Sequence, residues 1–348
     1  MDKSEILRMF LDKGYQIDVE TLDFFSKNEN SLQKFFSEIE KKSTPSTITL
    51  DFVETMLQSD VVIFSLNREN KKLTAEDLAK SLLERLSIIK KILVTHMDLV
   101  NLLSINKISQ KTKKFSLIGI VLRNDYSTQQ ITVADDTGEI DMRIDKKSSE
   151  EIQVNDVLGF VCEKDDIVRV KNVVFPDVPL RRNIKALVEE KNAVFAEKTN
   201  DSVLKWCAEN KNQIYLFTFT HHDDLSEIPA NVRLVFCGDG PTFANVSKMF
   251  SIFFFDGSFL KDLANDKKFD DFLVLQFRKR YFNATKKFDK IFINNAFVLE
   301  NIPDAIVVRG LGEAVQTNYK GTSLLSVTED TAWVISLKTR EIIKLSSP

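Results

Sequence analysis

The sequence is poor in the residues that build metal-dependent active sites. Its 348 residues include three histidines and 10 glycines. Hydrolases that work with two metal ions need several His and Asp ligands around those ions. They also use glycine-rich loops, which let the backbone come close to the metals. The composition therefore argues against an intact two-metal site.

Signals for secretion, membrane insertion and bulk nucleic-acid binding are also missing. The three cysteines, Cys162, Cys207 and Cys237, are too far apart to indicate a disulfide framework or a zinc cluster. No apolar run is as long as a membrane span, and "MDKSEILRMF" at the start lacks the core of a signal peptide. The formal net charge of −3 gives no overall basic field, although a local basic face stays possible. We expect an intracellular protein that binds no membrane.

The length suggests two or three domains, and the first part of the chain is expected to be helical. Apolar residues at helical spacing predict a small helical module over residues 1–58. Residues 59–98 are expected to hold a linker, roughly 59–73, and then a long helix. Thr74 and Asp77 have the spacing of a capping box at its start. We assign the apolar stripe of this helix to the core, and His96 to packing or capping.

In residues 99–183 the spacing of the apolar residues changes from the helical period to a period of two. This pattern predicts about five short strands, with a hairpin turn at Asp136–Thr137–Gly138. Five strands in about 80 residues suggest a small barrel of the OB type. Such barrels often bind single strands through exposed aromatic residues and a basic groove. This one offers Phe115, Tyr126, Phe160 and few others, so a packing role is favoured.

Residues 184–348 alternate between strands and helices, which indicates an α/β domain. We expect a helix at 202–210 and strands at 213–220, 232–240, 250–258, 305–310, 321–327 and 332–337. Many of these strands are apolar throughout and should be buried on both faces. The run Phe253–Phe255 is assigned to a central core strand, with a partner surface as the alternative.

Six segments, in order along most of the chain, match one family. They are LIGIVLRN (117–124), ITVADDTGEI (131–140), VVFPDVP (173–179), FFFDGSFLKDL (253–263), FRKRYFNA (277–284) and VLENIPDAIVVRGLGEAVQTNYKGTSLLSV (298–327). With them the chain resembles the small subunit of the archaeal D-family DNA polymerase, which is related to eukaryotic B subunits. The resemblance implies a multidomain α+β protein: a helical N-terminal module, an OB barrel and a calcineurin-like phosphodiesterase domain.

Active members of this family bind two metal ions and hydrolyse DNA from the 3′ end. On the family's Gly-His-x-His motif, both histidine positions are glycines here, Gly310 and Gly312. The histidine of its His-Gly motif is Asp256, and Gly-Asn-His-Asp survives only as "CGDGP" with Asp239. The Asp-x-His loop is shortened into residues 195–201. One or two carboxylates cannot build a two-metal site, so we expect no catalytic residue, metal or other cofactor.

The leading hypothesis is therefore a non-catalytic accessory subunit. It would form a heterodimer with the large catalytic subunit, scaffold it in DNA replication and meet DNA through the complex. The N-terminal module could bind other replication factors, and the setting would be intracellular and nucleoid-associated. The sequence does not show which residues contact the partner.

Two alternatives from other classes stay open. A divergent 3′→5′ exonuclease could use Asp223, Asp239 and Asp256. A free-standing single-strand-binding protein could use the barrel alone. The cluster His221–Asp224 suggests a metal site, but adjacent side chains tend to point in different directions, so we do not favour it.

Overall fold

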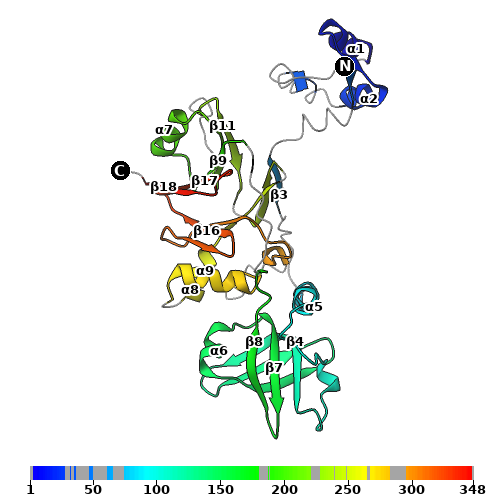
Figure 1. Cartoon of the computed structure of the whole chain (residues 1–348), viewed down its shortest axis with the longest axis vertical. Coiled ribbons are helices and arrows are strands. Elements are labelled where there is room, and N and C mark those ends of the chain that lie inside the picture. Colours follow the sequence, from blue (N-terminus) through cyan, green and yellow to red (C-terminus); the bar gives the residue numbers. More distant parts are fainter. Residues whose placement is uncertain are drawn as a thin grey trace. The chain divides into compact units, whose positions relative to one another are not determined.

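A computed structural model gives the fold. It describes residues 3–27, 32, 35–36, 47–49, 61–65, 74–179, 187, 189–220, 228–238, 240–247, 249–264, 267–282 and 295–346. The chain divides into two compact units (Figure 1). The first is Met1–Val62 with Asn245–Lys248, and the second is Ile63–Ala244 with Met249–Pro348.

The N-terminal module is built on a phenylalanine-rich core. Helices α1 (Lys3–Asp12) and α2 (Val19–Lys27) pack together through Phe10 and Phe25, whose ring centroids are 5.6 Å apart. The module also contains a pair of parallel two-residue strands, β1 (Gln16–Ile17) and β2 (Thr47–Ile48). The two helices agree with the expected helical module, whereas the two strands were not predicted, because two-residue strands have no periodicity to detect. Thr49 could also cap a helix over "LDFVETML", but that segment lies outside the described residues.

The linker expected at 59–73 is also partly wrong. Its apolar run forms strand β3 (Val61–Ser65), which takes an edge position in a six-stranded sheet. Four consecutive apolar residues, Val61–Phe64, suit a strand at a sheet edge but give no clear alternation between faces.

The long helix is confirmed as α5 (Ala75–Leu93), and the capping box is present. Thr74 Oγ1 accepts a hydrogen bond from Asp77 N at 3.2 Å, and Thr74 N donates to Asp77 Oδ2 at 3.1 Å. The apolar stripe of α5 belongs to the core, since Leu86, Ile89 and Leu93 are buried. No described helix is long and apolar enough to cross a membrane.

Five strands close into a barrel in the order β4-β5-β6-β8-β7. They are β4 (Lys114–Asp125), β5 (Gln130–Ala134), β6 (Glu139–Arg143), β7 (Val157–Lys164) and β8 (Val168–Val174). Helix α6 (Lys146–Glu151) joins β6 to β7, and the expected hairpin turn lies between β5 and β6. Gly119 is required where β4 meets β5, because a Cβ there would lie 2.4 Å from Val133 Cγ1 and 2.7 Å from Ala134 O. The expected five strands are confirmed.

Two further sheets form the C-terminal part. The five-stranded sheet has the order β11-β10-β9-β17-β18, and the six-stranded sheet has the order β15-β16-β14-β13-β12-β3. The first contains β9 (Lys191–Ala196), β10 (Gln213–Thr218), β11 (Val232–Phe236), β17 (Thr331–Ser336) and β18 (Ile342–Ser346). The second contains β12 (Thr242–Val246), β13 (Phe250–Asp256), β14 (Ala305–Arg309), β15 (Gln316–Tyr319) and β16 (Thr322–Val327).

Phenylalanine rings join the two sheets. Phe254 of β13 lies 5.8 Å from Phe195 and 5.2 Å from Phe217, measured between ring centroids. Phe253–Phe255 are at most 1% exposed, which confirms their assignment to a core strand. Residues 195–201 were expected to be a loop, but Phe195 and Ala196 end β9. The apolar run Ala193–Ala196 is too short for sequence periodicity to separate it from a loop.

Helices complete this part of the chain. They are α7 (Asp201–Glu209), α8 (Lys261–Ala264) and α9 (Phe269–Arg278). The helix expected at 202–210 is α7. Helix α9 was not predicted.

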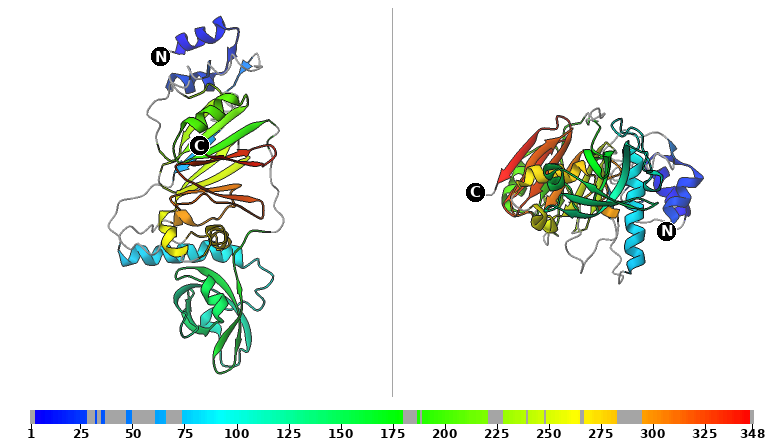
Figure 2. Two further views of the ribbon diagram at one scale, coloured as in Figure 1. Left: turned by 90° about the vertical axis from the view of Figure 1, so that its left-hand side faces the viewer. Right: turned by 90° about the horizontal axis from the view of Figure 1, so that it is seen from below.

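The barrel and the six-stranded sheet share one hydrophobic cluster. Leu86 and Ile89 of α5 pack in a single buried cluster with Ile120 of the barrel, Phe277 of α9 and Phe255 of β13. Figure 2 shows α5 running between the barrel and the sheet part of this unit. The molecule is thus a mixed α+β protein in which the barrel is packed firmly on the α/β part.

Candidate functional site

The loop that follows β14 meets Asp256 at the carboxyl ends of two parallel strands. Asp256 ends β13, Arg309 ends β14, and the two residues are register partners. Arg309 Nη2 lies 3.1 Å from Asp256 Oδ2, and the two side chains are 15% and 27% exposed. The carboxyl ends of parallel strands are where α/β proteins usually place ligands. Here that place holds an internal ion pair.

The second oxygen of Asp256 is also engaged. Its Oδ1 accepts a hydrogen bond from Ser258 N at 2.9 Å. The carboxylate is thereby held by a guanidinium on one side and a backbone amide on the other. A metal ion would have to displace the arginine to gain this ligand.

The other sheet reaches the same place with Glu197 and Phe219. The guanidinium carbon of Arg309 lies 5.4 Å from the Phe219 ring centroid, which is within the range of a cation–π contact. Burial raises the pKa of the Glu197 carboxyl, while the nearby Arg309 opposes that rise. Arg309 therefore connects the ends of both sheets. We call Glu197, Phe219, Asp256 and Arg309 the Arg309 cluster.

Gly310 and Gly312 have backbone angles that histidine rarely adopts. Their φ values are +82° and +91°, in the left-handed region. A Cβ on Gly310 would lie 3.0 Å from Asp256 Oδ1 and 3.2 Å from Ser258 N. A Cβ on Gly312 would lie 3.1 Å from Lys261 Nζ. The backbone of this loop therefore disfavours a histidine at either position.

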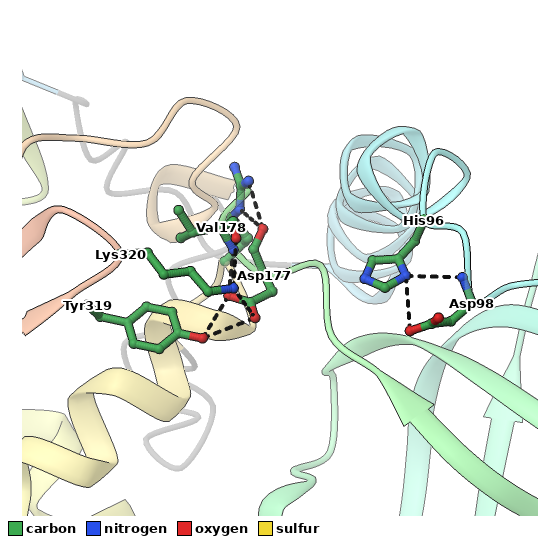
Figure 3. A network of polar contacts seen from close by, with 7 residues as sticks. His96, Asp98, Asp177, Val178, Tyr319 and Lys320 are labelled. Atoms are coloured by element: carbon green, nitrogen blue, oxygen red, sulfur yellow. Dashed lines mark hydrogen bonds and ion pairs between the residues drawn. The ribbon is translucent and has the colours of Figure 1, made fainter. Parts of the chain in front are cut away.

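The residues that the structure describes do not bring together the side chains of a two-metal centre. No group of three or more His, Cys, Asp or Glu side chains that could hold a metal occurs within the described residues. Asp239 and the cluster His221–Asp224 lie outside those residues. His96 is exposed, and its Nδ1 contacts the Asp98 amide at 3.4 Å (Figure 3).

Asp177 forms a second polar network, between the barrel exit and the β15–β16 hairpin. Its carboxylate accepts hydrogen bonds from Tyr319 Oη, at 3.1 and 3.0 Å, and from Lys320 Nζ at 2.8 Å (Figure 3). Its backbone carbonyl accepts from Arg280 Nη2 at 2.9 Å. Three of the segments that carry the resemblance thus meet at Asp177, where Tyr319 and Lys320 bind the carboxylate and Arg280 binds the backbone carbonyl.

The barrel has few of the features that bind single-stranded nucleic acid. Phe115 and Phe160 are buried, and Tyr126, 52% exposed, donates its hydroxyl to Ile152 O. Residues 99–179 contain eleven Lys and Arg against thirteen Asp and Glu, so the barrel sequence has no basic excess. Stacking platforms and a positive groove are the usual requirements for binding single strands.

The sequence analysis found Asp256 and the two glycines but missed Arg309 and Glu197. A signal for Arg309 existed, because a charged residue directly after the apolar run Ala305–Val308 is unusual for a buried strand. Nothing in the sequence indicated that Glu197 would face the same loop.

Comparisons with known proteins identify no family. No protein-family model matches the chain, and no curated protein matches it. Among solved structures it is similar to the solution NMR structure of the Thermotoga maritima protein TM1076. That match has 12% identity and a TM-score of 0.26, and it covers 45% of this chain and 98% of the other. A likeness this weak carries no argument about function.

Proposed function

We propose that this chain is a non-catalytic accessory subunit, the small subunit of a D-family DNA polymerase, which scaffolds the large catalytic subunit. The observation that carries the proposal is the Arg309–Asp256 ion pair. When the family's two histidines are set on Gly310 and Gly312, the glycine before them falls on Arg309. An internal cation then stands beside Asp256, which is the one described acidic residue placed on a ligand motif. This arrangement favours packing over hydrolysis.

The proposal assigns the barrel to the OB type and the C-terminal part to a degenerate calcineurin-like domain. Two features support the first assignment. The strand order closes through a parallel contact between β6 and β8, and a short helix lies between the third and fourth strands. Two packed sheets with parallel central strands support the second.

The shared core supports a scaffolding role. Because α5 and α9 pack the barrel and the six-stranded sheet into one hydrophobic cluster, the two parts can present a joint surface to a partner. The expected partner is the large polymerase subunit, and the chain would contact DNA as part of that complex. We propose an intracellular, nucleoid-associated setting. The N-terminal module would be free to bind other replication factors.

The exonuclease alternative makes a different prediction at the same cluster. It requires metal-dependent cleavage of 3′-end-labelled DNA that Asp256→Ala abolishes. We expect no cleavage by the purified chain with Mn²⁺ or Mg²⁺, and the same result for Asp256→Ala. Cleavage by the parent chain that is lost in this variant would establish the nuclease.

The test of the proposal itself is affinity purification of the tagged chain from its native cells, followed by mass spectrometry. A large polymerase subunit should co-purify in near-equal amount. If the chain is recovered alone, the scaffold proposal fails and the single-strand-binding alternative becomes the one to test. The sparse exposed aromatics of the barrel argue against that alternative.

A further inference from the structure

A buried ion pair crosses the contact between the barrel and the α/β part. Lys279, the C-cap residue directly after α9, places its Nζ 2.7 Å from Asp156 Oδ2. Asp156 lies in the turn that enters β7 of the barrel. The two side chains are 1% and 0% exposed. Charged groups are almost never buried to this extent without a specific partner.

A second cation from a third segment lies in the same place. Arg85 of α5 is 3% exposed, its guanidinium carbon lies 3.8 Å from the Tyr281 ring centroid, and Nη1 donates to Asn155 O at 3.4 Å. We call Arg85, Asp156 and Lys279 the buried ionic cluster. It holds two cations and one carboxylate, contributed by α5, the barrel and the end of α9.

This cluster is an unfavourable way to gain stability. Burial raises the pKa of the Asp156 carboxyl and lowers the pKa of both Lys279 and Arg85, because each loses its hydration. The hydrogen bonding is also incomplete within the described part of the chain, since Arg85 Nε, Asp156 Oδ1 and Lys279 Nζ form no hydrogen bond there, and Lys279 meets Asp156 as a charge contact only. Buried ion pairs often give no more stability than apolar side chains of the same volume.

Such a cluster can instead fix the relative position of the segments that carry its charges. The core around it is made of aliphatic and aromatic side chains, and apolar attraction is non-directional. Apolar surfaces can therefore slide or rotate against each other at small cost. The 2.7 Å contact requires Lys279 Nζ and Asp156 Oδ2 to stay together, and a displaced barrel would leave buried charges unpaired.

We propose that the buried ionic cluster fixes the orientation of the barrel on the α/β part, and that the stability of the joint comes from the apolar core around it. Asp156 and Lys279 are then positioning residues. Among the described residues, the other titratable groups that interact with the cluster include Tyr126, Tyr281, Glu151 and Lys267, and none of them forms the 2.7 Å contact. This inference does not depend on the polymerase assignment.

The test compares stability with orientation in the full-length chain. Spin labels are attached to cysteines introduced at Lys147 of the barrel and Thr339 of the sheet part, both exposed. The three native cysteines are buried and should not be labelled. The distance distribution between the labels is then measured by electron spin resonance, and the unfolding midpoint by urea titration.

Four variants separate the two roles. Asp156→Leu should raise the unfolded fraction by roughly 100- to 1,000-fold, because two buried cations lose their carboxylate. Lys279→Met should have a smaller effect, because Arg85 stays near Asp156. The triple change Arg85→Met, Asp156→Leu and Lys279→Met removes every charge of the cluster, so it should restore the parent midpoint but give a broader or shifted distance distribution. Arg85→Met with Asp156→Asn and Lys279→Gln keeps a directional polar pair, so its distribution should stay narrow.

The matched control is the exposed ion pair between Lys90 of α5 and Asp136 of the barrel, 3.2 Å apart. Replacing both of these residues with Met and Leu should change neither measurement. The proposal is overturned if the buried triple variant with Leu and Met keeps the parent's narrow distribution. It is also overturned if that variant is as unstable as Asp156→Leu, because the cluster would then be needed for stability. If this triple variant does not fold, a broadened distribution in the Asn–Gln variant overturns the proposal.

Discussion

Restoring the two histidines of the resembled motif should not restore a metal site. We consider the double change Gly310→His and Gly312→His. Each position has φ near +80° to +90°, where an L-residue costs roughly 1–2 kcal/mol. At Gly310 the new Cβ would also lie 3.0 Å from Asp256 Oδ1, which is already hydrogen-bonded to Ser258 N. That contact brings the expected cost at Gly310 to roughly 1–3 kcal/mol.

The cost at Gly312 should be smaller. Its neighbour there is the end of a flexible side chain, Lys261 Nζ at 3.1 Å, which can move aside. We therefore expect a total loss of roughly 2–5 kcal/mol in the free energy of unfolding, measured by urea denaturation. Gly310→Asn is the matched control, because asparagine tolerates the left-handed region better while adding the same Cβ.

Metal binding is the second readout of the same variant. Because Arg309 still forms its ion pair with Asp256, calorimetric titration of the variant with Mn²⁺ should show no binding of the metal. The reasoning is refuted if the double-histidine variant binds Mn²⁺ at one or two sites and keeps the stability of the parent chain. That result would mean that the loop is still a metal loop lacking only its ligands.

Three further predictions follow from the described contacts. Arg309→Met should lower stability by roughly 1–2 kcal/mol because it leaves Asp256 uncompensated, and adding Asp256→Asn should recover part of that loss in a double-mutant cycle. Hydrogen bonds from Ser127 and Thr128 lower the pKa of Asp125 to about 2, below the unfolded value near 4. Its contribution to stability should be present above pH 4 and be lost as the pH falls toward 2, and Asp125→Asn should flatten this part of a stability–pH profile. Burial raises the pKa of all three cysteine thiols, so Ellman's reagent at pH 8 should react with none in the native chain and three after denaturation, and reaction of the native chain would contradict the described burial.

The fold could be predicted where a local pattern decided the structure. The Thr74 capping box and the apolar stripe behind it gave the long helix, and the alternation over 115–175 gave the strands of the barrel. The phenylalanine run of β13 could be assigned to the core because it has no polar face. Short elements such as β1, β3 and β9 were missed, since their place depends on a partner strand from elsewhere in the chain.

The candidate site could be predicted only in part, for a related reason. Asp256 and the glycines could be read from a motif, but the partner of Asp256 could not. Arg309 is 53 residues away and reaches Asp256 only because β13 and β14 pair in parallel. The buried ionic cluster was also not foreseen, since its three members come from segments that meet only in the folded molecule.

The central claim is that this chain scaffolds a polymerase, and co-purification from native cells tests it most directly. The account predicts that the tagged chain is recovered with a large DNA polymerase subunit in near-equal amount, and that the recovered complex extends primers while the chain alone does not. Recovery of the chain with no polymerase subunit, under conditions in which it remains folded, would contradict the account.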